Sequence, residues 1–210
     1  CMAAASKTSN GSPTARILKA ARDVFAEEGF AGARVDVIAR KAGVNKAALY
    51  YHIGDKKALY AEVIHDVIGS AARRLQRGMG DASSPEEKIR TYIRTLARTF
   101  DENPQMPRLM MRELASGGQN LPGVFFDDLL ALFGTLSAIM EEGAESGAFD
   151  RTLPFIVHFM AIGATIVCKS VVPVVQASGQ ASAELKAMGS DVSGRAAREI
   201  ENLIVKAIRK

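Results

Sequence analysis

The sequence contains no tryptophan, only two cysteines, and few aromatic residues, which make up 6% of its 210 residues. Two cysteines, Cys1 and Cys168, cannot form the disulfide framework of a small secreted protein. Because 48% of the residues are hydrophobic, the chain can still bury a core, and Leu, Ile, Val, Met and Ala must fill it. Cys168 lies in an apolar run and is expected to be a small core residue.

The sequence also lacks alternating apolar and polar strand patterns, an apolar N-terminal leader and a run long enough to cross a bilayer. The longest apolar run, residues 154–168, is shorter than the roughly 18–20 residues that a spanning helix needs. Met2 is typical of a natural start, so we interpret Cys1 as an addition before it. We therefore expect a cytoplasmic protein with no membrane segment.

Helical patterns recur along the chain and predict an all-α fold of about nine helices without strands. Residues 1–11 are small and polar and are expected to be disordered. Residues 174–194 are rich in Ser, Gly, Ala and Gln and are expected to form a loop with at most one helical turn, near Leu185. The expected helices cover residues 13–28, 35–42, 46–52, 56–78, 85–102, 107–115, 121–146, 150–172 and 195–209.

The net charge of +4 is small, but most Lys and Arg residues lie in the first hundred positions. A locally basic segment attracts a phosphate backbone, although it can equally be a solvated helical surface. The basic residues concerned include Arg16, Lys19, Arg22, Arg34, Arg40, Lys41, Lys46, Lys56 and Lys57.

Residues 35–52 have the pattern of two short helices that cross at a sharp turn. Ala39 is small enough for the two backbones to approach, Gly43 tolerates the positive φ of the turn, and Leu49 can close the small core beneath it. Asn45 is a good cap for the second helix. This spacing predicts a helix-turn-helix.

The second of these helices is too short to bury two adjacent tyrosines and a histidine, Tyr50, Tyr51 and His52. A recognition helix in the DNA major groove presents such side chains to phosphates and base edges. Ala47 and Ala48 would let the backbone approach, and their methyl groups can contact thymine methyls. An ordinary helical corner with an aromatic surface remains the alternative from the local pattern alone.

The stretch from Ile38 to Leu59, IARKAGVNKAALYYHIGDKKAL, resembles the DNA-binding signature of the tetracycline-repressor (TetR/AcrR) family. The preceding Phe25 to Phe30 is similar to the end of that family's first helix, and the resemblance covers roughly residues 14–63. It implies that Tyr50 and Lys56 bind phosphates and that Tyr51 and His52 contact the backbone or base edges. The residues expected at the DNA are Arg34, Val35, Asn45, Lys46, Ala47, Ala48, Tyr50, Tyr51, His52 and Lys56.

Three residues depart from the family's usual pattern. Arg34 stands where a hydroxyl residue usually caps the first short helix, so an ionic contact to phosphate would replace a hydroxyl contact. Ala47 replaces a frequent glycine, which narrows the approach to the groove. Ile53 replaces the usual phenylalanine and is expected to be a conservative core change.

Residues 150–172 are apolar on nearly every side, which predicts burial all round. A subunit interface would bury such a helix, and so would the centre of a single core. The resemblance favours the first, because it implies a homodimer formed through the helices 150–172 and 195–209. It also implies a domain division into residues 12–54, which bind DNA, and residues 55–210, which bind an effector and dimerise.

Met and Phe residues are frequent between Tyr92 and Phe159, where they can line an adaptable apolar pocket or simply fill a core. The resemblance implies that a small apolar or aromatic effector binds in this region. Arg112, Glu113 and His158 could anchor it, although His158 can equally be a core histidine. The expected effector-binding residues are Phe100, Met110, Met111, Glu113, Phe126, Phe133 and His158.

Nucleophile-elbow, phosphate-loop, dinucleotide-binding and metal-ligand patterns are missing from the sequence, and its three His residues are dispersed. We therefore expect no enzyme activity, no catalytic residues, no cofactor and no metal. The resemblance implies a ligand-responsive repressor that binds a palindromic DNA operator as a homodimer. Two alternatives remain: a DNA-bound scaffold whose C-terminal domain binds a protein, and a ligand carrier without DNA activity.

Overall fold

The computed structural model describes residues 12–180, 182–183 and 192–210, and within these ranges the chain is helical without a named strand. An isolated β-bridge pairs Phe149 with Arg209. The predicted all-α fold is confirmed, whereas the disorder expected for residues 1–11 and the turn expected near Leu185 lie outside the described residues. The helices are α1 Pro13–Gly32, α2 Val35–Ala42, α3 Lys46–Ile53, α4 Lys56–Gly78, α5 Pro85–Glu102, α6 Met106–Ala115, α7 Gly123–Glu145, α8 Pro154–Ala177 and α10 Val192–Ile208, with a short 3₁₀ turn at Met79–Asp81.

Side-chain caps begin four of these helices at the residues that the sequence indicates. Each cap oxygen accepts a hydrogen bond from a backbone N–H three residues further on, and so satisfies a donor that has no partner within the helix. The capping residues and their donors are Ser12 with Ala15, Asn45 with Ala48, Asp55 with Ala58 and Ser84 with Glu87, at 2.7–3.2 Å.

Helix α8 differs most from its predicted bounds. It begins at Pro154 instead of residue 150, because the N–H of Asp150 donates to the carbonyl of Ile208 at 2.9 Å and keeps the preceding segment non-helical. It also continues through Pro173 to Ala177, although proline usually ends a helix at the preceding residue. The predicted end at residue 172 is therefore wrong.

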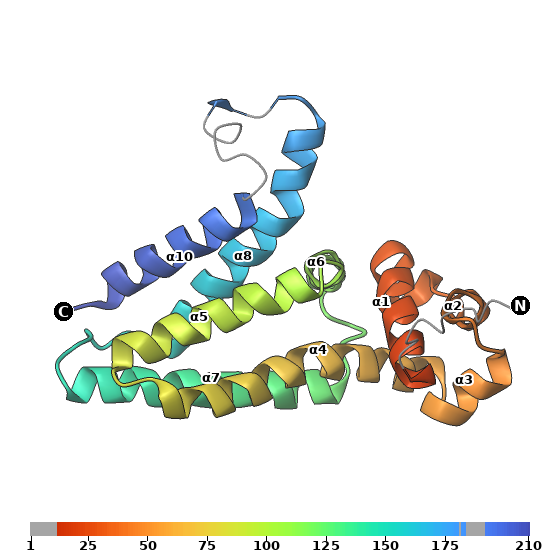
Figure 1. Cartoon of the computed structure of the whole chain (residues 1–210), viewed down its shortest axis with the longest axis horizontal. Coiled ribbons are helices and arrows are strands. Elements are labelled where there is room, and N and C mark those ends of the chain that lie inside the picture. Colours follow the sequence, from red (N-terminus) through yellow and green to blue (C-terminus); the bar gives the residue numbers. More distant parts are fainter. Residues whose placement is uncertain (1–11, 181, 184–191) are drawn as a thin grey trace, which may run out of the picture.

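The helices form an elongated molecule with α1, α2 and α3 at one end (Figure 1). Helices α4, α5 and α7 pack against one another along the body, and α8 and α10 pack together on the other side of α5. Helix α6 contacts both α1 and α8 and therefore lies between the N-terminal helices and the body. This arrangement places α6 and the start of α4 where the two parts of the chain meet.

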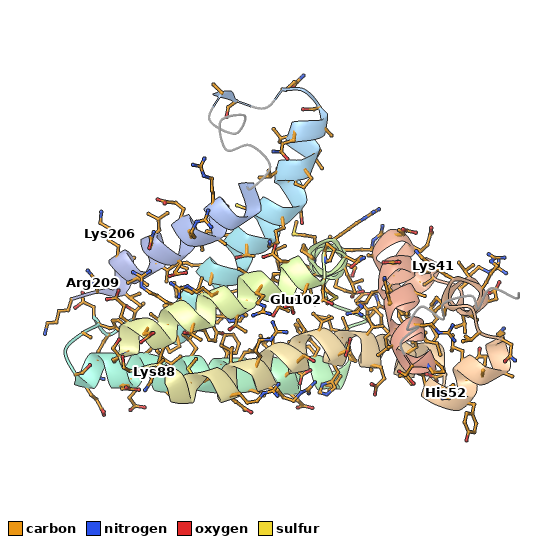
Figure 2. All side chains as sticks on the ribbon, in the orientation of Figure 1. Lys41, His52, Lys88, Glu102, Lys206 and Arg209 are labelled. Carbon is orange, nitrogen blue, oxygen red and sulfur yellow. The ribbon has the colours of Figure 1, made fainter. Side chains whose placement is uncertain are left out.

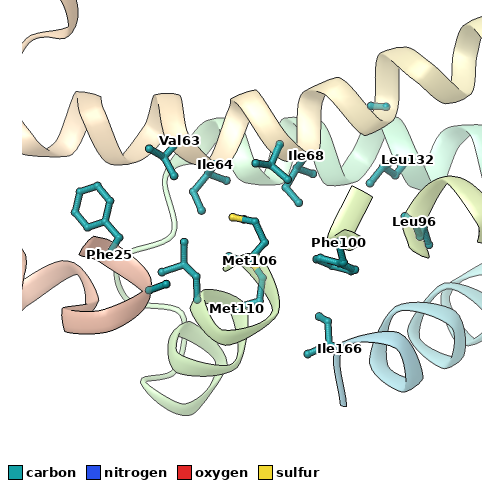
Figure 3. Packing of buried hydrophobic residues seen from close by; sticks show 14 of the residues in the cluster. Phe25, Val63, Ile64, Ile68, Leu96, Phe100, Met106, Met110, Leu132 and Ile166 are labelled. Atoms are coloured by element: carbon teal, nitrogen blue, oxygen red, sulfur yellow. The ribbon is translucent and has the colours of Figure 1, made fainter. Parts of the chain in front are cut away.

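One hydrophobic core runs through both parts of the chain. Figure 3 shows Met106 and Met110 of α6 between Phe25 of α1 and Phe100 of α5. Ile166 of α8 lies at the far side of the same cluster. Because this core is continuous, a displacement of α6 is felt by α1 through direct packing.

Helices α7 and α8 are each long and apolar enough to cross a membrane by length and composition, and 28% of the tested window of each is buried. The apolar run of residues 154–168 is too short to cross a membrane, but α8 continues beyond it to Ala177 and is long enough. Much of the apolar surface of α8 faces outward, which excludes the alternative of a helix at the centre of a single core. Its exposed apolar residues are Phe155, Ile156, Phe159, Met160, Val167, Val171 and Val174.

Candidate DNA-binding surface and effector cavity

The turn between α2 and α3 has the geometry that its sequence predicts. Gly43 has φ 66° and ψ 37°, a left-handed conformation that glycine adopts without steric cost. The N–H of Val44 donates to the carbonyl of Ala39 at 3.0 Å, and the side chains of Ile38, Ala39 and Leu49 are buried beneath the turn. These contacts fix the angle at which α3 leaves α2.

Helix α3 presents most of its side chains to solvent. Tyr51 is 87% exposed and Tyr50 44% exposed, whereas Leu49 is fully buried. Lys46, Ala47 and His52 are also exposed, Ala48 is half-buried, and Figure 2 shows His52 at the end of the molecule farthest from α10. Large aromatic side chains held in water without a packing role are available to a partner.

The two residues predicted at the start of α2 differ in exposure. Arg34 is exposed, makes no side-chain cap, and pairs with Asp36 at 3.4 Å. Val35 is buried, so its side chain cannot contact DNA. What Val35 can offer is its backbone N–H, which lies in the first turn of α2, where the helix carries partial positive charge.

Lys56, the predicted phosphate-binding lysine, is already held in place by the N-terminal helices. Its Nζ donates to the carbonyl of Ala31 at 3.1 Å and lies 4.8 Å from the centroid of the Phe30 ring. An ammonium group has three donors, so this arrangement leaves donors for a further acceptor. The sequence motif predicted the residue but not the contacts that orient it.

A cavity of about 470 Å³ lies in the body of the molecule, between α4, α5, α6, α7 and α8. Its volume is typical of sites for small molecules. Its wall is mostly aliphatic and aromatic, with three polar side chains, Thr99, Glu113 and His158. The lining residues are Ile68, Ala71, Leu96, Thr99, Phe100, Met110, Glu113, Leu114, Gly117, Gly118, Leu121, Phe125, Phe126, Leu129, Leu132, His158, Phe159, Ile162 and Ile166.

The structure brings five of the seven expected effector-binding residues to this cavity: Phe100, Met110, Glu113, Phe126 and His158. Two do not line it. Met111 is exposed on α6, and Phe133 packs behind the wall with its ring 4.6 Å from that of His158.

Other contacts near the cavity were not predictable from residue type. Arg112, considered as a polar anchor, instead donates to the carbonyl of Glu27 at 2.9 Å, and its side chain packs against Gly29. Leu96, Leu132, Ile162 and Ile166 line the cavity without having been predicted. Their apolar periodicity places them inside the fold but does not say which of them border empty space.

His158 is a buried histidine that also borders the cavity. Its Nδ1 lies 2.6 Å from the hydroxyl of Tyr92, which is itself buried. In the described part of the chain this nitrogen is the acceptor within reach of that hydroxyl, so Tyr92 donates to Nδ1 and the ring proton resides on Nε2. Burial lowers the pKa of His158 to about 4, which keeps the ring neutral at pH 7.

This depressed pKa predicts a pH dependence of stability. An unfolded histidine has a pKa near 6.5, so between about pH 6.5 and 4 the unfolded chain binds the extra proton and the free energy of unfolding falls. Replacing His158 by Gln, whose amide oxygen can still accept from Tyr92, should remove this component, which amounts to about 3 kcal/mol at its limit. Urea unfolding of both proteins from pH 7 to pH 4.5 measures it, and parallel pH profiles would contradict it.

Another buried polar contact of the cavity wall joins α4 and α6. The Tyr60 hydroxyl donates to Oε1 of Glu113 at 2.7 Å. Burial, together with this hydrogen bond, holds the pKa of Tyr60 above its usual range, so the hydroxyl stays protonated. The Tyr60 ring lies 4.8 Å from that of Phe25 and 5.1 Å from that of Phe30, so the same side chain touches the cavity wall and α1.

An exposed helix set by a left-handed glycine turn, joined to a helical domain with an apolar cavity, defines a helix-turn-helix transcriptional regulator. Comparison with known families gives the particular family. Residues 17–63 match bacterial regulatory proteins of the tetR family, and residues 85–177 match the tetracyclin repressor-like C-terminal domain. The chain belongs to the TetR family of transcriptional regulators, and the resemblance seen in its sequence is confirmed.

Individual relatives agree with this assignment. The transcriptional regulator RutR of Escherichia coli is 33% identical over 149 residues, which cover 71% of this chain and 70% of RutR. The repressor NicS of Pseudomonas putida is 28% identical over 139 residues, covering 63% of this chain and 64% of NicS. Helices α7 and α8 both fall entirely in the matched C-terminal domain, which accounts for their apolar length as part of a helical domain.

Solved structures share the fold at lower sequence identity. The ketosteroid transcriptional regulator KstR2 of Mycobacterium tuberculosis superposes with a TM-score of 0.73 at 17% identity and covers 96% of this chain and 97% of its own. The regulator FadR of Bacillus subtilis, solved in complex with stearoyl-CoA, gives a TM-score of 0.68 at 21% identity over 93% of this chain and 99% of its own. These similarities establish the fold.

Proposed function

We propose that the protein is a ligand-responsive repressor that binds a palindromic DNA operator as a homodimer and is released by a small apolar or aromatic effector. The observation that carries the DNA-binding role is the exposure of α3, whose Tyr50, Tyr51 and His52 project into solvent while Leu49 anchors the helix. The proposed DNA-binding residues remain those that the sequence indicates, with Val35 contributing through its backbone. Residues 12–54 would bind DNA, and residues 55–210 would bind the effector and dimerise.

The proposed dimer rests on the outward apolar surface of α8 and on its neighbour α10. Apart from the cavity-lining Phe159, six large apolar side chains of α8 and Leu203 of α10 are exposed in the single chain. Exposed apolar surface of this extent favours association. The two helices pack together, so their counterparts in a second copy can complete a four-helix arrangement.

The effector is proposed to bind in the cavity bounded by Phe100, Met110, Glu113, Phe126 and His158. The stearoyl-CoA complex of the FadR neighbour supports an apolar ligand in this class of domain. Release from DNA would follow because α4 carries both Tyr60, which is hydrogen-bonded to the cavity-lining Glu113, and Lys56 at the DNA-binding end of the same helix. A coupling of about 1–3 kcal/mol between the two sites suffices for regulation.

The alternatives are less well supported. A DNA-bound scaffold would be favoured by a closed, cavity-free C-terminal domain with an exposed apolar surface. This domain has exposed apolar residues on α8, but it also contains a cavity of about 470 Å³. A ligand carrier without DNA activity does not account for the exposed aromatic residues of α3. The repressor role takes support from NicS, a relative that is named as a repressor. A regulator of this kind would work in the cytoplasm and would need no enzyme activity.

The proposed function predicts steeply salt-dependent binding to duplex DNA from upstream of the protein's own gene. About 6–10 phosphate contacts for each dimer give a slope of log Kobs against log salt between about −5 and −9. Fluorescence anisotropy of a labelled duplex between 50 and 200 mM salt measures this slope, with a shuffled duplex as control. Absence of binding, or binding that does not change with salt, would contradict the proposal.

A further inference from the structure

The strongest unexplained feature of the cavity is a buried carboxyl group with one oxygen unpaired. Glu113 is 2% exposed and lines the cavity. Its Oε1 accepts from the Tyr60 hydroxyl, but its Oε2 has no hydrogen-bond partner. Among the described residues no Lys, Arg or His pairs with Glu113, and the neighbouring Arg112 points away to the carbonyl of Glu27.

The cavity wall does not supply the missing donor. Of the other two polar lining residues, Thr99 donates its hydroxyl proton to the carbonyl of Thr95 at 2.7 Å, and His158 accepts from Tyr92 through Nδ1. Among the described residues neither of them forms a hydrogen bond with Glu113. A buried carboxylate oxygen without a donor is destabilising, because it has lost its bonds to water and gained none in return. A molecule in the cavity can supply this donor.

The Glu113 carboxyl group can reorient towards a molecule in the cavity by rotation of its own side chain. Oε2 is closed off from solvent in this structure, but rotation about the Cγ–Cδ bond of Glu113 follows a soft, broad torsion. Such a rotation changes the direction of both carboxyl oxygens without moving the backbone.

We propose that the effector is an apolar molecule that carries one N–H or O–H donor and places it on the Glu113 carboxylate. This inference rests on the proposed effector site and gives the chemical class of its ligand. Amines and alcohols with an apolar body fit it. A carboxylate does not, because a second anion beside Glu113 would be repelled and has no donor to offer.

The test uses four ligands with the same apolar body and different end groups: 4-phenylbutylamine, 4-phenylbutan-1-ol, butylbenzene and 4-phenylbutanoate. Isothermal titration calorimetry on the full chain without DNA measures the dissociation constant of each. We expect the amine and the alcohol to bind at least about tenfold more tightly than the hydrocarbon and the carboxylate. Equal binding of all four, tighter binding of the carboxylate, or no binding by any of them would overturn the proposal.

Variants test whether Glu113 causes the preference for ligands that carry a hydrogen-bond donor. Glu113→Gln should reduce the preference for donors to less than about threefold, because the amide is neutral and donates as well as accepts. Glu62→Gln makes the same chemical change at an exposed position of α4 and should leave the preference intact. A preference that survives in Glu113→Gln would overturn the proposal, and the series on the unmodified protein decides the matter if this variant does not fold.

The experiment separates this inference from the proposed function, since it contains no DNA. Salt-dependent operator binding without a donor preference would overturn the ligand class alone. A donor preference without operator binding would overturn the proposed regulator and leave the ligand site standing.

Discussion

Replacing Tyr50 by Phe and Lys56 by Met together, which makes four changes in a dimer, is expected to weaken operator binding at least about ten-thousandfold at fixed salt. Each change removes a hydrogen bond to a charged phosphate, which is worth about 1.5–3 kcal/mol in a protein. Because a dimer carries two copies of Lys56, the slope of log Kobs against log salt should also become less steep by about 2. Fluorescence anisotropy with the operator duplex measures both quantities.

Met is chosen at position 56 so that a loss of DNA binding does not result from a loss of folding. Its side chain can still pack against Phe30, which the Lys56 ammonium group now covers at 4.8 Å. Lys88→Met removes the same charge from α5, far from α3 in Figure 2, and should leave the affinity unchanged. An unchanged salt slope in the double variant would mean that Lys56 does not contact phosphate.

Replacing Val167 and Val171 by Glu is expected to convert the proposed dimer into monomers. Both residues are exposed on α8, one helical turn apart, and would place four unpaired carboxylates in the dimer interface. Burying a charge without a partner costs about 3–5 kcal/mol in such an interface, so the dimer dissociation constant should rise by at least about a thousandfold. Sedimentation at micromolar concentration measures it, and operator binding should weaken in parallel.

A matched control exists on a neighbouring helix. Leu130 of α7 is 67% exposed, more than either valine, so Leu130→Glu introduces the same charge on another exposed apolar residue. It should leave the sedimentation coefficient unchanged. A double α8 variant that remains a dimer would place the interface elsewhere.

The features that could be predicted from the sequence are local ones. A cap such as Asn45 acts on an N–H three residues away, and Gly43 was predictable because its φ of 66° is a property of a single residue. Leu49 was predictable because a two-turn helix has one face that can reach a small core. Each of these effects depends on only a few consecutive residues. The helix-turn-helix was therefore predicted with its bounds nearly correct.

The features that could not be predicted depend on contacts between distant residues. The start of α8 is set by the pairing of Asp150 with Ile208, and the orientation of Lys56 by Ala31 and Phe30. The cavity wall combines residues of five helices, so residue type alone could not separate Phe126, which borders it, from Phe133, which lies behind it. Glu113 was predicted as an anchor, but its unpaired oxygen follows only from the tertiary contacts around α6.

Selection of bound duplexes from a random DNA pool tests the central claim most directly. If two α3 helices of a symmetric dimer bind successive major grooves, the enriched sequences should contain an inverted repeat whose half-site centres are about 34–36 Å apart, which is about one helical turn. The double Tyr50 and Lys56 variant, run in the same selection, should enrich nothing. Enrichment of single half-sites, or of no sequence at all by the unmodified protein, would contradict the account.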